Sequence, residues 1–305
     1  MIYTVTLNPS LDYNISIENF KPGQINIVDN SYLLPGGKGI NVAKMLNHFE
    51  HPVKALGFLA GFTGREIARK LESEGLTCDF IELENGISRI NIKLKSEVET
   101  EINGLGPQVT EADIAKLMAK TEQIKDGDFL ILSGSIPTST NVNLYEAIIR
   151  QLGHKKVNVV IDARRDLLKD CLKYHPFLIK PNIHELGEIF NVKIRSDAEL
   201  EHYAAELKAL GAINVLVSLS KDGAFFLDAD GQHYHVKAPQ GILVNSVGAG
   251  DAMVAGFISG YLTRHDKQYA LQKAVAAGSA SAFSKGLATK NQVEEMMRMV
   301  EVNAQ

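Results

Sequence analysis

From residue 110 to residue 219 the chain alternates between helix-like and strand-like segments, and each strand-like segment ends in polar residues. Similar segments occur before residue 110. We expect helices over 63–73, 110–123 and 141–152, and strands over 2–7, 53–58, 128–132, 157–161, 177–179 and 215–219. Consecutive strands joined by a helix pair in parallel, because the crossover returns the chain to the same edge of the sheet. The pattern predicts an α/β fold with a mostly parallel sheet, covered by helices on both faces, that binds ligands at the carboxyl ends of its strands.

Two stretches fall outside this alternation. Residues 13–34 and 88–103 alternate apolar and polar side chains, which is typical of strands with one buried face. In the second stretch we expect Ile90, Ile92 and Leu94 to point inward, and Arg89, Asn91, Lys93 and Lys95 to point outward. The two stretches predict a small separate sheet that acts as a lid over the site or as an interface, within a single domain over 1–305.

The loop from Asn245 to Asp251 carries two glycines and leads directly into a helix-like run. Glycines let the backbone come close to a ligand, and the first N–H groups of a helix are free to bind an oxyanion such as a phosphate. A carboxylate beside a bound phosphate is unfavourable unless it has a chemical task. Asp251 is therefore a candidate base that accepts the proton of an attacking hydroxyl, although a helix cap would have the same sequence.

A second glycine loop, 35–41, opens another helix-like run and carries Lys38. Its spacing is not that of a Walker A loop, because no Ser or Thr follows the lysine, and it lacks the dinucleotide-binding pattern. The alternative is a flexible turn with a solvated lysine. Asp12, just past the end of the first strand, lies where α/β folds place ligand-binding residues.

Asn182 and Glu185 are three residues apart at the start of an expected helix and would share one face. They are suited to orient water around Mg²⁺, and a helix N-cap with an acidic first turn predicts the same two residues. His184-Glu185 begins a zinc-protease pattern, but the second histidine is missing, so the sequence does not support a metal hydrolase.

Composition excludes several other classes. The net charge of −4 is not accompanied by a basic cluster, so we expect no nucleic-acid or membrane-surface partner. The two cysteines form no spacing motif, and no apolar run approaches the ~20 residues of a membrane span. We expect a cytoplasmic protein. A Rossmann dehydrogenase is set aside, because Asn8-Pro9-Ser10 stands where its glycine-rich turn would follow the first strand.

Four motifs occur in a defined order along the chain: Thr6-Leu7-Asn8-Pro9-Ser10-Leu11-Asp12, Gly36-Gly37-Lys38-Gly39-Ile40-Asn41, Lys180-Pro181-Asn182-Ile183-His184-Glu185 and Val247-Gly248-Ala249-Gly250-Asp251. With these motifs the chain resembles, over nearly its whole length, the ribokinase-like (phosphofructokinase B) family of carbohydrate kinases. The resemblance implies a parallel sheet sandwiched by helices, with a β-sheet lid that often forms a homodimer interface. It also implies ATP as phosphoryl donor and Mg²⁺ as cofactor.

The resemblance assigns roles to particular positions. Asp251 would be the general base, and Gly248, Ala249 and Gly250 would form the anion hole. The positions that match sugar contacts are Asp12, Gly37, Asn41 and Asn103. The positions that match nucleotide contacts are Lys180, Asn182, Ser218, Ser220, Gly223 and Ser279, with Asn182 and Glu185 as the magnesium motif. Some members also bind a monovalent cation, and the corresponding positions, which leave a potassium site open, are Asn245, Val247, Ser281, Ser284 and Gly286.

The charge of the second glycine loop bears on the substrate. A neutral sugar needs no cation there, whereas a sugar phosphate brings nearly two negative charges, and Lys38 and Arg89 are the cations placed to meet them. Arg89-Ile90-Asn91 and Thr100-Glu101-Ile102-Asn103-Gly104 resemble the bacterial 1-phosphofructokinase branch. The resemblance implies phosphorylation of D-fructose 1-phosphate at its 6-hydroxyl. A tagatose-6-phosphate kinase and a non-catalytic sugar-phosphate sensor are the alternatives, and a sensor would not need Asp251.

Overall fold

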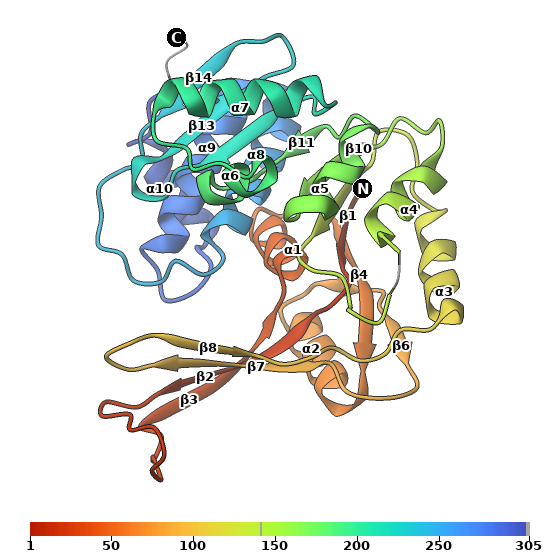
Figure 1. The fold of residues 1–305 in the computed structure, drawn as a ribbon, viewed down its shortest axis with the longest axis vertical. Coiled ribbons are helices and arrows are strands. Elements are labelled where there is room, and N and C mark those ends of the chain that lie inside the picture. Colours follow the sequence, from red (N-terminus) through yellow and green to blue (C-terminus); the bar gives the residue numbers. More distant parts are fainter. Residues whose placement is uncertain (141, 303–305) are drawn as a thin grey trace.

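The computed structural model describes residues 1–140 and 142–302. Its main sheet contains the strands β1 (Ile2–Thr6), β4 (Val53–Ala60), β5 (Thr77–Cys78), β6 (Ile81–Leu83), β9 (Phe129–Ser133), β10 (Asn158–Asp162), β11 (Leu178–Ile179), β12 (Val215–Ser218), β13 (Ala224–Leu227) and β14 (His233–Val236). The order across the sheet is β14-β13-β12-β11-β10-β9-β1-β4-β5, and β6 pairs with β4. Neighbours from β12 to β5 are parallel, and among the described strands of this sheet only the edge β12-β13-β14 is antiparallel. The sheet is therefore mostly parallel, as predicted (Figure 1).

Helices cover both faces of this sheet (Figure 1). They are α1 (Lys38–His48), α2 (Gly61–Ser73), α3 (Glu111–Thr121), α4 (Leu144–Leu152), α5 (Arg165–Leu172), α6 (Ile183–Phe190), α7 (Asp197–Ala209), α8 (Ala249–Arg264), α9 (Lys267–Ala282) and α10 (Lys290–Met297). The buried apolar residues form two clusters. One contains residues of α1, α2, α8, α9 and α10, and the other contains residues of α3 to α7. Two cores on opposite faces hold the strand ends in fixed positions. None of the described helices is both long and apolar enough to cross a bilayer.

Small residues bring α8 and α9 close together. A Cβ on Gly256 would lie 2.6 Å from the Lys273 carbonyl oxygen, and a Cβ on Gly260 would lie 2.7 Å from Ala270 Cα. Both separations are too short for any side chain, so the two glycines are required for this packing. The close contact fixes the direction of α8, whose first turn carries Asp251.

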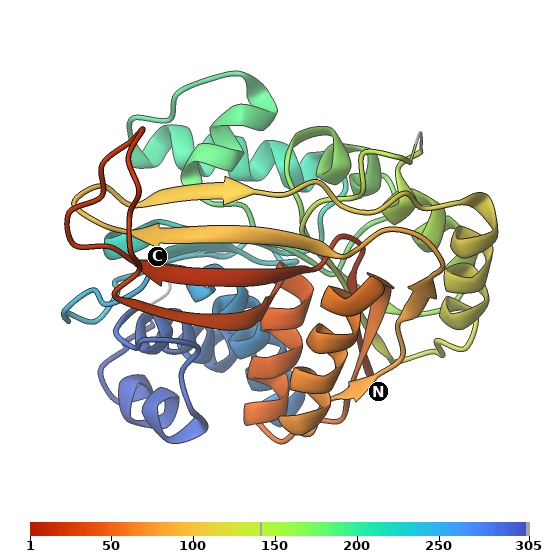
Figure 2. The same cartoon turned by 90° about the horizontal axis from the view of Figure 1, so that it is seen from below.

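The second sheet is the predicted lid, and it extends away from the main sheet (Figure 1). Its strands are β2 (Ser10–Ser16), β3 (Asn30–Gly36), β7 (Arg89–Lys95) and β8 (Thr100–Asn103), in the order β3-β2-β7-β8. They lie side by side in Figure 2. Strands β2 and β7 pair in parallel, so the lid joins two segments far apart in the sequence.

The register of the lid assigns its two faces. Paired residues share a face. One row across the four strands is Leu34-Asp12-Asn91-Asn103, and the adjacent row on the opposite face is Leu33-Tyr13-Ile92-Ile102. The predicted alternation in β7 is correct. Its direction is confirmed at the end of the strand, where Leu94 is buried and Lys95 is exposed, but it was wrong for Arg89 to Lys93. The polar residues Arg89, Asn91 and Lys93 line the cavity between lid and core, and Ile90 is 36% exposed on the other face.

Local expectations failed at three other places. Helix α2 begins at Gly61, two residues before the expected start, and the Thr63 hydroxyl in its first turn donates to the Ser88 carbonyl. Ile25 and Ile27 lie in a loop between β2 and β3 and are 98% and 83% exposed. The helix expected from residue 141 begins at Leu144, and residue 141 itself lies outside the described residues.

Candidate active site

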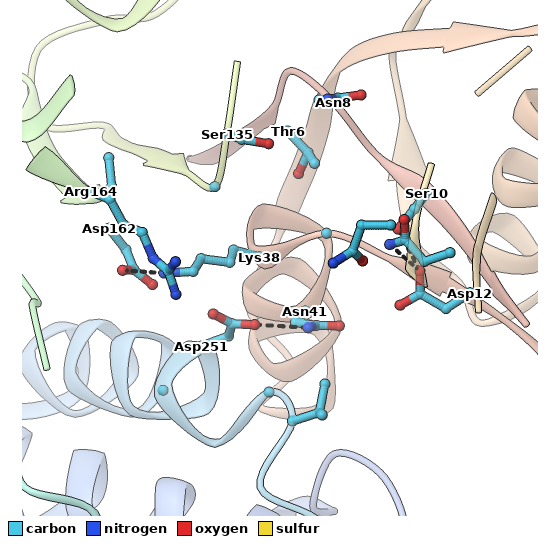
Figure 3. A pocket seen from close by; sticks show the side chains of 18 of the residues that line it. Thr6, Asn8, Ser10, Asp12, Lys38, Asn41, Ser135, Asp162, Arg164 and Asp251 are labelled. Atoms are coloured by element: carbon cyan, nitrogen blue, oxygen red, sulfur yellow. Dashed lines mark hydrogen bonds and ion pairs between the residues drawn. The ribbon is translucent and has the colours of Figure 1, made fainter. Parts of the chain in front are cut away.

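A cavity of about 630 Å³ lies between the lid, the carboxyl ends of the main strands and the N-termini of α1 and α8 (Figure 3). Its size suits a small ligand. Most of the predicted site residues line it: Asp12, Gly37, Lys38, Asn41, Arg89, Asn103, Lys180, Asn182, Glu185, Ser218, Val247, Gly248, Gly250 and Asp251. The topology therefore brings segments from the whole chain into one site, at the edge where α/β sheets bind ligands.

The glycine loop before α8 has the geometry of an anion site. Gly248 is the N-cap of α8 and has φ 83°, a left-handed conformation that glycine adopts without strain. Among the described residues no backbone acceptor is present for the N–H groups of Gly250 and Asp251. A Cβ on Gly250 would lie 3.2 Å from Lys180 Nζ, so this position holds the backbone close to a cation. Free N–H groups, the helix dipole and a neighbouring ammonium together favour a bound phosphoryl group.

Asp251 lies in the first turn of α8 and is 6% exposed. Asn41 Nδ2 donates to Asp251 Oδ2 at 2.8 Å (Figure 3). Burial and the nearby charge of Asp162 raise the pKa of Asp251 to about 6, although Lys38, Asn41 and Lys180 act in the opposite direction. A carboxyl with this pKa is ionised at pH 7 and remains basic enough to accept a hydroxyl proton in a transition state.

Asp162, at the end of β10, is a site residue that the sequence reasoning did not assign. Its side chain is 1% exposed, and its Oδ1 lies 2.8 Å from Lys38 Nζ and 3.7 Å from Lys180 Nζ. Burial opposes its charge, but Lys180 and Lys38 hold the pKa of Asp162 below its usual range. The carboxylate thus holds two ammonium groups at the strand ends, beside the anion loop.

Lys38 is not where we expected it. Sequence analysis paired it with Arg89 as two cations for one sugar phosphate. In the structure its ammonium lies 2.8 Å from Asp162 (Figure 3). It also lies 3.8 Å from Glu185. Burial lowers the pKa of Lys38, but Asp162, Glu185 and Asp251 together raise it above its ordinary value. Lys38 therefore belongs to the charge cluster around Asp251, because the buried Asp162 carboxylate attracts it there.

Arg89 lies at the base of the lid, where its Nε donates to the Asn8 carbonyl at 3.0 Å. Among the described residues it forms no ion pair with a carboxylate, and burial lowers the pKa of its guanidinium. Lys93, the other lid cation that lines the cavity, is neutralised by Glu101 at 2.7 Å. The charge of nearby Asp12 acts in the opposite direction and raises the pKa of Arg89, but no carboxylate of the described residues forms a direct ion pair with it. A desolvated guanidinium without a direct ion-pair partner is suited to bind an anionic group of a ligand.

Asp12 is held in place by its neighbours in the lid. Ser10 Oγ donates to Asp12 Oδ1 at 2.6 Å, and Asn91 Nδ2 donates to the same oxygen at 2.9 Å. Asp12 and Asn103 lie in the row of the lid that faces the cavity. The position of Asp12, with one oxygen fixed, suits recognition of a sugar hydroxyl.

Asn182 and Glu185 form a capping box at the start of α6. Asn182 Oδ1 accepts from the Glu185 N–H at 2.8 Å, and Glu185 Oε2 accepts from the Asn182 N–H at 3.0 Å. The helix-cap interpretation is therefore correct, and it does not exclude a second role. Glu185 Oε1 faces Arg164 Nε at 2.9 Å and lines the cavity.

The residues present fit a magnesium ion that keeps most of its water. Asp162 Oδ2 is buried and has no hydrogen-bond partner among the described residues. No group of three or more acidic, His or Cys side chains suited to hold a metal was found in the described part of the chain. Mg²⁺ bound mainly through water and substrate phosphates needs no such group.

The remaining predicted positions do not line the cavity. Asn245 donates from its backbone N–H to the Ala282 carbonyl and from Nδ2 to the Lys285 carbonyl, so its loop lies against residues 281–286, where Ser281, Ser284 and Gly286 occur. Gly223 has a structural reason to be glycine, since a Cβ there would lie 1.9 Å from the Val236 carbonyl oxygen. The others lie in the first turn of α8, in the 3-10 turn Ser220–Asp222 and in α9: Ala249, Ser220 and Ser279.

Comparison with known proteins agrees with the fold and identifies the family. A family model described as pfkB family carbohydrate kinase matches residues 6–294. The 1-phosphofructokinase of Bacillus subtilis is 42% identical over 302 residues, which cover 99% of both chains. The D-tagatose-1-phosphate kinase of Bacillus licheniformis is 38% identical over 303 residues, again with 99% of both chains covered.

Solved structures agree with the sequence relatives. Phosphofructokinase-2 from Escherichia coli, in complex with substrates and products, has a TM-score of 0.91 at 25% identity and covers 97% of this chain and 98% of that chain. The same protein in complex with potassium has a TM-score of 0.89 at 26% identity, with the same coverage. A family match over nearly the whole chain, full-length relatives and a carboxylate beside an anion loop all lead to one conclusion. The chain belongs to the pfkB family of carbohydrate kinases.

Proposed function

We propose that the protein transfers the γ-phosphoryl group of ATP to the 6-hydroxyl of D-fructose 1-phosphate. The observation that carries the proposal is the place of Asp251: a buried carboxylate beside two free helix N–H groups and within the influence of two lysines. This arrangement supports proton removal from a hydroxyl and charge stabilisation on the group that the hydroxyl attacks.

The proposed step is an in-line transfer of the phosphoryl group from ATP to the sugar. The sugar oxygen O6 forms a bond to Pγ, and the bond from Pγ to the bridging oxygen breaks with its electron pair leaving on ADP. The hydroxyl proton passes to Asp251. The N–H groups of Gly250 and Asp251, with Lys38 and Lys180, meet the negative charge of the transferring phosphoryl group. Catalysis of this kind depends on positioning and on electrostatic stabilisation.

The acceptor phosphate is assigned to Arg89. Its half-buried guanidinium has no carboxylate partner among the described residues, and a bidentate phosphate contact would satisfy its remaining N–H groups. Arg89 is in the lid, whereas Asp251 is at the start of α8. A ketose 1-phosphate that spans them would present its 6-hydroxyl to Asp251. Asp12, Asn41 and Asn103 would contact the intervening hydroxyls, and the loop of Gly37 would close on them.

Magnesium and potassium are part of the proposal. Asp162, Asn182 and Glu185 would hold Mg²⁺ through water, and the ion would supply charge neutralisation on the donor phosphates. The contact between the Asn245 loop and residues 281–286 supports a K⁺ site there. The nucleotide would approach along the ends of β11 and β12, past Lys180 and Ser218, toward Ser220, Gly223 and Ser279.

Substrate choice is tested with a panel of ketose phosphates. Purified protein with Mg·ATP, with and without KCl, should give a kcat/KM for fructose 1-phosphate at least about tenfold above those for tagatose 1-phosphate, tagatose 6-phosphate and fructose 6-phosphate. Such a margin is typical where buried polar groups read sugar hydroxyls. Tagatose 1-phosphate is the second candidate, because a kinase for it is 38% identical over the full length. A tenfold higher kcat/KM for either tagatose phosphate would make that sugar the proposed substrate and would leave the assignment as a sugar-phosphate kinase unchanged.

We also expect a homodimer formed through the lids. The row Leu33-Tyr13-Ile92-Ile102 crosses all four lid strands on the face away from the cavity. Ile102 is 57% exposed in this row, and apolar rows of this kind are covered by a partner in stable sheets. Light scattering at micromolar concentration should give twice the chain mass, and Ile102→Asp should give one chain mass. Met299→Asp, at an equally exposed site outside the lid, is the control. A wild-type monomer would contradict the prediction.

A further inference from the structure

We propose that Asn41 is a positioning residue for Asp251: it fixes one oxygen of the carboxylate so that the other faces the acceptor hydroxyl. This inference rests on the proposed function, in which Asp251 is the base. It gives Asn41 a role beyond the sugar contact that the family resemblance implies.

The contact joins two helices at their N-termini. Asn41 is in the first turns of α1, and Asp251 is in the first turn of α8, 210 positions later in the chain. The two helices pack against each other, and Asn41 Nδ2 lies 2.8 Å from Asp251 Oδ2. A Cβ on Gly248 would lie 3.6 Å from the same amide nitrogen, so the glycine loop borders the contact.

The chemistry of the two groups determines which atoms meet. A carboxylate only accepts hydrogen bonds, so the Asn41 atom that faces it must be the NH₂ group, because a carbonyl oxygen there would be repelled. The amide cannot accept a proton from Oδ2, so a proton taken up by Asp251 goes to Oδ1. Among the hydrogen bonds and ion pairs of the described residues none uses Asp251 Oδ1, and this atom is not among the buried polar atoms left without a partner. It therefore remains accessible to a hydroxyl.

The amide has a second end. In Figure 3 the Asn41 oxygen points away from Asp251, on the side where Asp12 lies. A sugar hydroxyl that donates to this oxygen would lie next to the hydroxyl that Asp251 deprotonates. The planar amide of Asn41 would then hold both the Asp251 carboxylate and the sugar next to the reacting hydroxyl. Precise alignment of reacting groups can change a rate strongly, because it lowers the entropy cost of reaching the transition state.

The charges around Asp251 make the contact energetically important. Asp162 faces it from β10, Lys38 from α1 and Lys180 from the end of β11, with Glu185 and Arg164 paired behind them. Burial and Asp162 favour the protonated carboxyl, whereas Lys38, Asn41 and Lys180 favour the charged form. Of the three groups that favour the charged carboxylate, Asn41 is the neutral one. Its removal would leave the lysines in place and shift the balance toward protonation.

The first experiment measures pH–rate profiles with whichever sugar phosphate the wild type phosphorylates. Asn41→Leu keeps the side-chain size and loses the donor. We expect kcat at pH 7 to fall about tenfold or more, and the acidic limb of the profile to move up by ~1 to 2 pH units, the value of one charge-assisted hydrogen bond. Raising the pH should recover part of the loss. Asn41→Asp adds a second carboxylate that must share a proton with Asp251, so its acidic limb should move further.

A double-mutant cycle separates positioning from substrate contact. In an Asp251→Asn background, Asn41→Leu should cause less than about a twofold further loss of kcat, since the group it orients is gone, while the loss of its sugar contact should appear in KM. A full multiplicative loss of kcat would overturn the proposal. A raised KM for the sugar, with the acidic limbs of Asn41→Leu and Asn41→Asp both unmoved, would overturn it too. Asn47→Leu on the same helix, where the amide donates only to the Glu74 carbonyl, is the matched control and should leave the profile unchanged.

One measurement does not depend on activity. Carbon-13 NMR of labelled Asp carboxyls should show one signal, absent in Asp251→Asn, whose titration midpoint moves up in Asn41→Leu and stays in place in Asn47→Leu. An unmoved midpoint would also overturn the proposal. If the wild type phosphorylated no sugar phosphate, the proposed function would fail while this titration still decided whether Asn41 controls Asp251.

Discussion

We expect Asp251→Asn to lower kcat by ~10²–10⁴-fold, the usual contribution of a positioned general base. The amide has the size of the carboxylate but cannot take the hydroxyl proton. It can still accept a hydrogen bond from Asn41 through its oxygen, so the fold and the anion loop should persist. Steady-state kinetics with Mg·ATP would show the loss in kcat, and nucleotide affinity measured by calorimetry should stay within a few-fold.

The matched control is Asp197→Asn. Asp197 is also in the first turn of a helix, α7, but it is exposed and lies outside the cavity. The turnover number of the Asp197→Asn variant should equal that of the wild type. The profile of wild-type kcat/KM should also fall as the pH drops below about 6, because Asp251 then binds a proton and is no longer a base. If Asp251→Asn retained near-normal turnover, Asp251 would not be the general base.

The main fold was predictable because it depends on local signals. Apolar runs of strand length that end in polar residues occur where β1, β9, β10 and β12 lie, and the structure confirms them with shifts of one residue. The sequence pattern also predicted a lid. It could not give the direction of the lid faces, because alternation is the same whichever face is turned toward the core. That direction follows from the pairing of β2 with β7 and from the cavity beneath them.

The site was predictable only as far as its motifs extend. Gly248 is favoured by its positive φ, and Gly250 lies where a Cβ would crowd the Lys180 ammonium, so glycine marks both in the sequence. Nothing in the local sequence distinguishes Asp162 in this way. It is one carboxylate after an apolar strand, and its importance comes from Lys38 and Lys180, which are brought to it by tertiary packing. Polar residues at the ends of strands were the available signal, and Asp162 was one of several.

The ion pair of Lys38 with Asp162 determines what its removal should do. We expect Lys38→Met to lower kcat by ~10²–10³-fold, the loss typical when one group that stabilises transition-state charge is removed. The ammonium lies between Asp162 and Glu185, beside Asp251, so its contribution should be to the transferring phosphoryl group. Without the Lys38 ammonium, less positive charge would offset the negative charge of Asp162 near Asp251. The pKa of Asp251 should then rise, and the acidic limb of the pH–rate profile should move to higher pH.

Arg89→Met is the contrasting variant, because Arg89 lies in the lid and is assigned to the acceptor phosphate. It should raise the KM for the sugar phosphate by ~10- to 150-fold, the value of one charge-assisted contact, with a smaller effect on kcat. Melting temperatures would check that Lys38→Met still folds, since Asp162 keeps Lys180 at 3.7 Å as a partner. If Lys38→Met instead raised the KM for the sugar phosphate and left kcat unchanged, Lys38 would bind the acceptor phosphate, and its ion pair with Asp162 would have to open when the sugar enters.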